Sequence, residues 1–285
     1  MALAAWALGG PAGAWCRTTT VPAQPDPLVC PQEGAPLAWP FACVGLRLDP
    51  TTPLPGVRLE VLRRVTVDAM AAWASRPCAG DGGRTGSAGP SMRLLLLGDR
   101  ADPVGYFDGG PNANTIALRT RWSDDPFHPP DAAAVTVVTF APDTAEILDA
   151  DTELNLEGFR FVVDDDRQGS DLQTILGHEF GHTLGLAHSP DRSAVMWYSA
   201  GRGEQRRALS SDDAAGVCAI YPPGRSTVCV PELRRVALEG GGLPLACGAR
   251  PRLPPTVPLG RGLVPLGVAL AWVWGRRRRA VTGRR

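Results

Sequence analysis

The sequence predicts a layered α/β domain, and three observations lead to this prediction. Apolar residues recur at three- and four-residue spacing in residues 57–73, which is typical of an amphipathic helix. Several short extended runs, separated by turn-forming residues, follow a Gly-rich break. Two helical segments come last. A helix, strands and two further helices in this order are typical of an α/β layered fold.

Each element has its own signal in the sequence. The first helix would lay Val61, Leu62, Val65, Ala69 and Trp73 on a core and act as scaffold. The second helix can be capped by Ser170 or Asp171, and the third begins at residues 211–213 and stops at Pro222-Pro223. Strands are expected at residues 93–97, 115–119, 134–140 and 159–163, with 146–154 as a candidate for one more.

The 285 residues are enough for one sizeable domain with appendages. We expect an apolar signal peptide, an irregular lead-in rich in Cys and Pro, the domain itself, a linker, and an apolar tail that ends in arginines. Their bounds are 1–15, 16–56, 57–224, 225–262 and 263–285. The signal is weak, because no basic residue precedes its apolar run.

Charge and cysteine content narrow the function classes. Basic and acidic residues balance at 29 each, so no overall field would recruit nucleic acid. Seven cysteines without a CxxC pair favour disulfides and an exported, extracellular or envelope protein. The connectivity stays open, and the short loops Cys30–Cys43 and Cys218–Cys229 are the first pairs to test. Lipidation of Cys16 is disfavoured by the bulky Trp15 before it.

The tail contains a continuous apolar segment followed by four arginines. Residues 263–274 are apolar or Gly and Pro, and Arg276–Arg279 follow. Twelve residues fall short of the roughly 20 that span a bilayer. Two interpretations stay open: a tail without a partner, or an envelope anchor or sorting signal with its arginines on the cytoplasmic side.

Three of the four histidines lie within eleven residues, in the run HEFGHTLGLAH at 178–188. His178 and His182 are four residues apart, so on a helix their imidazoles share one face and can bind one ion. Glu179 is rotated by about 100° from His178, outside the ligand set and beside the metal. This is the position of a general base.

A continuing helix would carry His188 away from the ion, because six further residues advance roughly 9 Å. Gly185 tolerates left-handed backbone angles, so the helix can end there and the chain can turn back. Three imidazoles suit zinc and leave the fourth position to water, which predicts a catalytic site. The alternative is a set of helical histidines that only form hydrogen bonds within the core. The full motif of eleven residues argues against this alternative.

These residues resemble the metzincin metallopeptidases, and within them the matrixins. Met196 stands where the family has its Met-turn under the zinc, Ser189 follows the third histidine as in matrixins, and residues 209–217 and 147–155 resemble family segments. The resemblance implies a metzincin-type zincin domain, a twisted mixed sheet with an active-site helix and a C-terminal helix. It also implies one catalytic zinc.

Tyr198 gives a second signal. In the astacin and serralysin branches of the metzincins, a Tyr at this spacing after the Met can donate a hydrogen bond to the oxyanion. The resemblance therefore suggests Tyr198 as an oxyanion donor. The other interpretation, that Tyr198 only packs in the pocket wall, stays open.

The sequence also departs from the matrixins of animals. No cysteine-switch segment is evident, although Cys16, Cys30 and Cys43 are candidates for it, and the His-rich loop of a second zinc is absent, with His128 the only histidine left. Asp164–Asp166 offer oxygen ligands for Ca²⁺, with a solvated acidic turn as the alternative.

The expected activity is hydrolysis of protein or peptide substrates by a monomeric enzyme. Residues 134–140 resemble the sheet edge that binds an extended peptide in such enzymes. Two alternatives are kept: an inactive zinc-bearing binding module, and a narrow peptidase that matures one partner protein or a wall peptide.

Overall fold

A computed structural model describes the main body of the chain and one segment of the tail. The described residues are 15–21, 26–78, 88–108, 110, 112–164, 166, 168–225, 229 and 267–273. The predicted signal peptide, apart from Trp15, most of the linker and Arg276–Arg279 lie outside this set.

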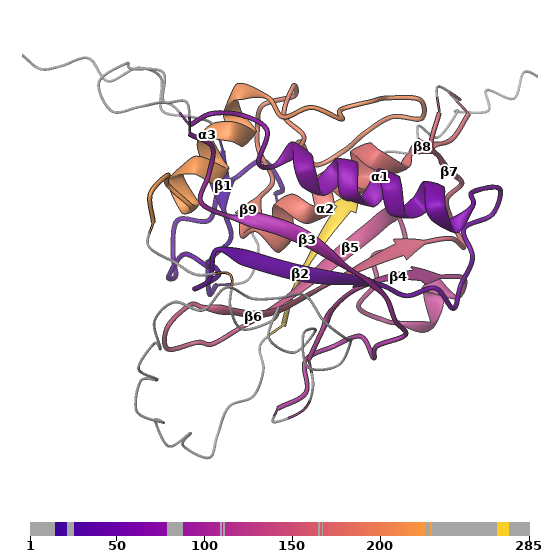
Figure 1. The fold of residues 1–285 in the computed structure, drawn as a ribbon, viewed down its shortest axis with the longest axis horizontal. Coiled ribbons are helices and arrows are strands. Elements are labelled where there is room, and N and C mark those ends of the chain that lie inside the picture. Colours follow the sequence, from indigo (N-terminus) through magenta and orange to yellow (C-terminus); the bar gives the residue numbers. More distant parts are fainter. Residues whose placement is uncertain are drawn as a thin grey trace, which may run out of the picture.

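A six-stranded mixed sheet forms the centre of the molecule (Figure 1). Its order is β10-β5-β6-β4-β2-β3. The strands β2, β3, β4 and β6 run parallel to one another, whereas β5 is antiparallel to β6 and β10 is antiparallel to β5. The bounds are β2 Cys43–Leu48, β3 Arg93–Asp99, β4 Asn114–Arg119, β5 Ala132–Phe140, β6 Ile147–Asn155 and β10 Gly267–Val273.

Three α-helices of the described residues complete the fold, and all three share the main core with the sheet. Apolar residues of α1 (Leu59–Ala72) and α2 (Leu172–Thr183) join those of the sheet in one buried cluster, to which α3 (Ser211–Ile220) adds its own. The largest buried side chains there include Phe140, Phe180, Leu46 and Ile175. The predicted α/β fold, with an active-site helix and a C-terminal helix, is confirmed.

Most of the predicted strands are present, and one region was misjudged. The interpretation of residues 16–56 as irregular is wrong for β2, a buried strand in the middle of the sheet. Its short run includes Gly45 and Arg47, which hid the strand pattern. The expected strand at 159–163 shrinks to the pair β7 (Phe161–Val162) with β8 (Ser170–Asp171).

The disulfides differ from the two loops chosen from the sequence. The described pairs are Cys16–Cys30, Cys43–Cys229 and Cys78–Cys218. Short loops were a poor guide because the fold brings cysteines together across 140 and 186 residues. Cys247, the seventh cysteine, lies outside the described residues.

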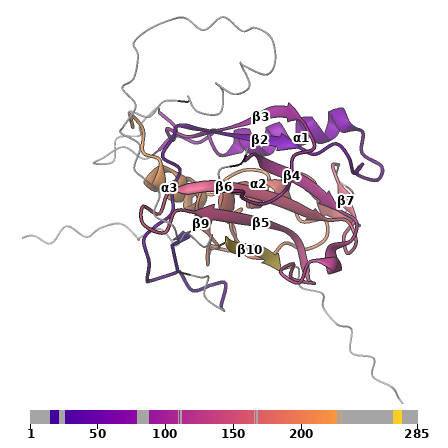
Figure 2. The same ribbon diagram turned by 90° about the horizontal axis from the view of Figure 1, so that it is seen from below.

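The tail contributes a strand that was not expected. β10 lies beside β5 at the margin of the sheet (Figure 2). In the part of the chain that the structure describes, no helix has the length and apolar character needed to cross a membrane.

Candidate metal centre

Helix α2 positions the first two histidines and Glu179. Asp171 caps its start, since its side chain accepts a hydrogen bond from the amide of Thr174 at 2.9 Å. The helix packs against the sheet and against α1, and His178, Glu179 and His182 have no exposed surface. A buried helix presents these groups with little freedom to rotate.

The chain leaves α2 through a turn at Gly185, as predicted. Gly185 has φ 88°, a left-handed angle, and its amide donates to the carbonyl of His182 at 2.9 Å. The lead-in supports this turn, because the amide of Thr18 donates to the carbonyl of Gly185 at 2.9 Å. β1 (Cys16–Arg17) then pairs with β9 (Leu186–Ala187), just before His188.

The three imidazoles converge. Each offers a ring nitrogen, and these atoms all lie within 4.8 Å of one another. The Nδ1 atoms of His178 and His182 donate to the carbonyls of Val195, at 2.7 Å, and Leu186, at 2.9 Å. This bonding places the proton on Nδ1 and the lone pair on Nε2, the form that binds a metal.

The environment of the rings fits a zinc ion. Among the described residues, Nε2 of His182 and Nε2 of His188 are buried without a hydrogen-bond partner. Burial lowers the pKa of His182 to about 4 and lowers the pKa values of His178 and His188 well below the ordinary 6.5. The neighbouring imidazoles lower those of His178 and His188 further. Three neutral nitrogen donors are a set that zinc prefers.

Glu179 is held by the sheet rather than by its own helix. The Thr136 hydroxyl, in the middle of β5, donates to Glu179 Oε2 at 2.7 Å. The other carboxylate oxygen, Oε1, is buried and has no hydrogen-bond partner among the described residues. Burial raises the pKa of Glu179 to about 8, and the Thr136 hydrogen bond opposes this shift.

The turn at Met196, predicted from the sequence as the Met-turn, lies against α2 and is anchored by α3. The Met196 sulfur occupies the space where Gly181 would carry a Cβ, so Gly181 permits this close approach. The Asp213 carboxylate accepts hydrogen bonds from the amides of Val195, at 2.8 Å, and Met196, at 3.0 Å. The Ser189 hydroxyl donates to the neighbouring Asp212 at 2.6 Å. Asp212 and Asp213, at the start of α3, therefore bind the chain both directly after His188 and at Met196.

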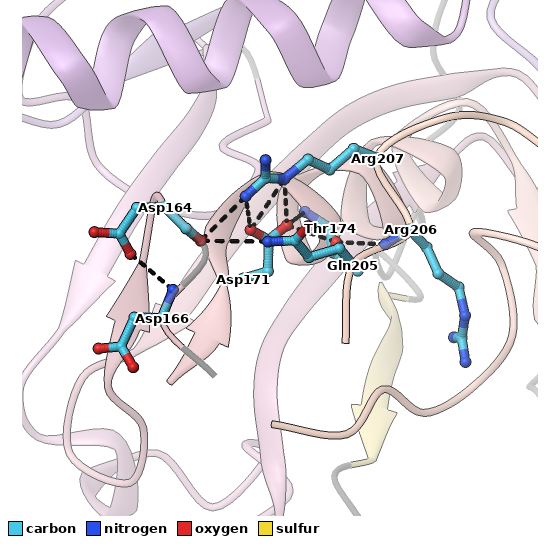
Figure 3. A network of polar contacts seen from close by, with 7 residues as sticks. All are labelled: Asp164, Asp166, Asp171, Thr174, Gln205, Arg206 and Arg207. Atoms are coloured by element: carbon cyan, nitrogen blue, oxygen red, sulfur yellow. Dashed lines mark hydrogen bonds and ion pairs between the residues drawn. The ribbon is translucent and has the colours of Figure 1, made fainter. Parts of the chain in front are cut away.

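A polar network joins the loop after the Met-turn to the start of α2 (Figure 3). Arg207 Nε donates to both carboxylate oxygens of Asp171 at 3.1 Å, and the amide of Arg206 donates to the Thr174 hydroxyl at 2.8 Å. The Arg206 guanidinium points away from Asp171 and pairs with Glu204. This network fixes the loop one helical turn before His178.

Tyr198 and the acidic residues 164–166 are the remaining site candidates from the sequence. The Tyr198 ring is in contact with the Trp197 ring, with centroids 4.8 Å apart. The Asp166 carboxylate pairs with Arg160 at 2.7 Å, and the Asp164 carbonyl accepts from Gln205 at 3.3 Å. Asp165 lies outside the described residues.

Sequence reasoning missed Thr136. Its signal was present, because Thr136 and Thr139 are the two hydroxyl residues in the otherwise apolar run 132–140.

Comparison with known proteins finds similarity to one family, the matrixins. The matrixin family of peptidases matches residues 115–222. Metalloendoproteinase 1-MMP of Arabidopsis thaliana is 44% identical over 68 residues, 22% of this chain and 19% of the relative. Matrix metalloproteinase-20 of Homo sapiens is 32% identical over 108 residues, 36% and 22% respectively.

A third relative, the interstitial collagenase of Bos taurus, is 45% identical over 60 residues. That match covers 21% of this chain and 12% of the collagenase. The chain thus spans about a fifth or less of the length of these relatives. The matched region contains β4, β5, β6, α2, the three histidines and α3. Residues 115–222 therefore match the matrixin family, and the chain is matrixin-like in this region.

Proposed function

We propose that this protein is a zinc-dependent endopeptidase. The observation that carries the proposal is the convergence of three imidazoles, two of them fully buried, beside Glu179. Oε2 of Glu179 is bound by Thr136, and its Oε1 has no hydrogen-bond partner among the described residues. His178, His182 and His188 would hold the ion. A zinc ion bound there would polarise a peptide carbonyl and lower the pKa of a water molecule toward about 7.

Glu179 is assigned the proton transfers. Oε2 is fixed by Thr136, and Oε1 is the atom left to accept the proton of the attacking water. Glu179 would then hand this proton to the amine nitrogen as the peptide bond breaks. Because the carboxylate is held at one end only, it can take up and release a proton without leaving its position.

The substrate is proposed to be an extended protein or peptide segment. The edge of β5 away from β6 runs past Glu179, and β10 occupies this edge in the described chain. A substrate strand could bind the same backbone groups through main-chain hydrogen bonds in place of β10. Side-chain pockets would then choose the bond that is cleaved. The loop of residues 195–206 is the candidate wall for the main pocket.

The competing proposal is a zinc-bearing binding module without turnover. Glu179 argues against it, since a binding module needs no base beside the metal. Incubation of the zinc-loaded protein with a diverse peptide library, with and without a chelator, separates the two. Chelator-sensitive cleavage of many peptides supports an endopeptidase, cleavage of very few supports a narrow maturation peptidase, and zinc binding without cleavage supports the module.

We expect one tightly bound zinc per chain. Acid should release it, because protonated imidazoles no longer bind metal. Elemental analysis after dialysis measures the stoichiometry, and His188→Ala should weaken retention sharply. No zinc, or two equivalents that survive dialysis, would contradict this assignment.

Tyr198 remains a candidate oxyanion donor. If it donates to the transition state, Tyr198→Phe should lower kcat and kcat/KM together by roughly 10- to 1000-fold at an unchanged KM. An unchanged kcat at matched zinc occupancy would assign the residue to the pocket wall.

We also propose that the protein is exported and monomeric. Calcium binding at residues 164–166 and envelope association of the tail are two further candidates. The three disulfides support export. Light scattering tests the monomer, and calcium titration of the protein tests the acidic turn. Residues 267–273 cannot enter lipid while their backbone is paired with β5, so envelope association would require β10 to leave the sheet.

A further inference from the structure

β10 occupies the sheet edge to which a peptide substrate would bind. It pairs antiparallel with β5 over nearly the whole strand, from Gly267 opposite Thr139 to Val273 opposite Ala132. β6 pairs with the other side of β5, so within the described part of the chain β10 completes the hydrogen bonding of this edge. A substrate strand and β10 would need the same row of backbone groups.

The register places β10 at the level of the candidate centre. Leu270 is the partner of Thr136, the residue whose hydroxyl holds Glu179. The paired segment extends three residues to either side of Leu270. It therefore runs past the site rather than ending before it.

The burial of the centre agrees with an occupied edge. His178, Glu179 and His182 have no exposed surface, although a substrate has to reach Glu179 and the metal. His188 keeps some exposed surface, so the burial concerns the α2 side of the centre. A peptide that reaches Glu179 along β5 has to displace what covers it there.

We propose that residues 267–273 are an autoinhibitory strand that competes with substrate for the β5 edge. The inference rests on the proposed peptidase activity. Covalent attachment gives the segment a high effective concentration at β5, which a peptide substrate in solution has to overcome. Residues 267–273 carry no charge, so β10 brings no unpaired charge to the sheet edge.

The test breaks the pairing in the full chain. Successive residues of a strand direct their N–H groups to opposite sides, so the adjacent substitutions Ala269→Pro and Leu270→Pro together remove at least one donor to β5. The matched control is Ala280→Pro with Val281→Pro, which alters the tail beyond the paired register. Peptide cleavage and hydrogen exchange of the amides of residues 132–140 are measured for wild type, variant and control.

We expect the double variant to raise kcat/KM by about 10-fold or more. KM should fall while kcat stays unchanged, because saturating substrate displaces β10 from the wild type as well. Exchange at residues 132–140 should be faster in the substrate-free variant, and the control should match the wild type in both measurements.

Equal kcat/KM in wild type and double variant would overturn the autoinhibitory role, whatever the exchange rates. Zinc-loaded proteins that all fail to cleave any peptide would instead overturn the proposed function. Exchange at residues 132–140 is measured without substrate, so it reports the pairing of β10 in either case.

Discussion

The hydroxyl of Thr136 donates to Oε2 of Glu179 across 2.7 Å and connects the sheet to the carboxylate beside the three histidines. Thr136→Val keeps the shape of the side chain and removes this donor. We expect kcat to fall about 10-fold or more, since a hydrogen bond to a charged group contributes about 1.5–3 kcal/mol.

Two controls accompany that substitution. Thr136→Ser should restore most of the activity, because it restores the hydroxyl. Thr139→Val, three residues along the same strand and on its opposite face, should leave kcat unchanged. Equal kcat values for Thr136→Val and the wild type would contradict the orienting role of Thr136.

Gly185→Ala should reduce both stability and zinc affinity. The left-handed angle costs a non-glycine residue about 1–2 kcal/mol, and a Cβ would also lie 2.9 Å from the carbonyl oxygen of Leu37. Gly56→Ala is the matched control, because Gly56 has φ 76° and no atom within 4 Å of its added Cβ. Urea unfolding should show the larger loss for Gly185→Ala, and zinc titration should show weaker binding for that variant alone.

Asp213→Asn should loosen the turn at Met196. The Asp213 carboxylate accepts hydrogen bonds from the backbone amides of Val195, Met196 and Ser210, whereas an Asn side chain has one acceptor oxygen and directs an NH₂ group at one of these donors. We expect a loss of about 1.5–3 kcal/mol in the free energy of unfolding. Asp212→Asn should lose less, because the Asp212 carboxylate accepts a hydrogen bond from the Ser189 hydroxyl rather than from the backbone amides of the turn.

Asp151 should make stability depend on pH. Burial raises its pKa from the ordinary 3.8 to about 6, even though the amides of Gly105 and Thr115 donate to it. Between these values the folded protein retains a proton that the unfolded chain has released, so the free energy of unfolding falls as pH rises from about 4 to about 6.

Denaturant unfolding at several pH values measures this dependence. The stability of the wild type relative to Asp151→Asn should fall across that interval and level off above it. Asp143→Asn, at an exposed position, controls for the loss of one carboxylate. A constant difference between Asp151→Asn and the wild type would show that Asp151 does not titrate in this range.

Local signals predicted the helices and most of the sheet from the sequence. The periodicity of α1, the cap at Asp171, the positive φ of Gly185 and the spacing of the histidines are all properties of short segments. Such features are visible in the sequence because they depend on neighbours three to seven residues away.

The features that the sequence did not predict depend on contacts between segments far apart in the chain. β2 lies inside a sheet between β3 and β4, and its neighbours cannot be inferred from the run Cys43–Leu48 alone. The Thr136–Glu179 hydrogen bond spans 43 residues. The pairing of Cys43 with Cys229 and of β10 with β5 likewise brings together residues far apart in the chain.

The most direct test of the central claim is the cleavage rate of Glu179→Gln at measured zinc occupancy. The comparison uses the full chain, both with the native tail and with Ala269→Pro and Leu270→Pro, so that occupation of the β5 edge does not hide activity. With Glu179 present, we predict one zinc per chain and cleavage that a chelator abolishes. Glu179→Gln should retain the zinc and the fold but lose at least about 100-fold in kcat. Cleavage by zinc-loaded Glu179→Gln at the rate of its Glu179 counterpart would contradict the account.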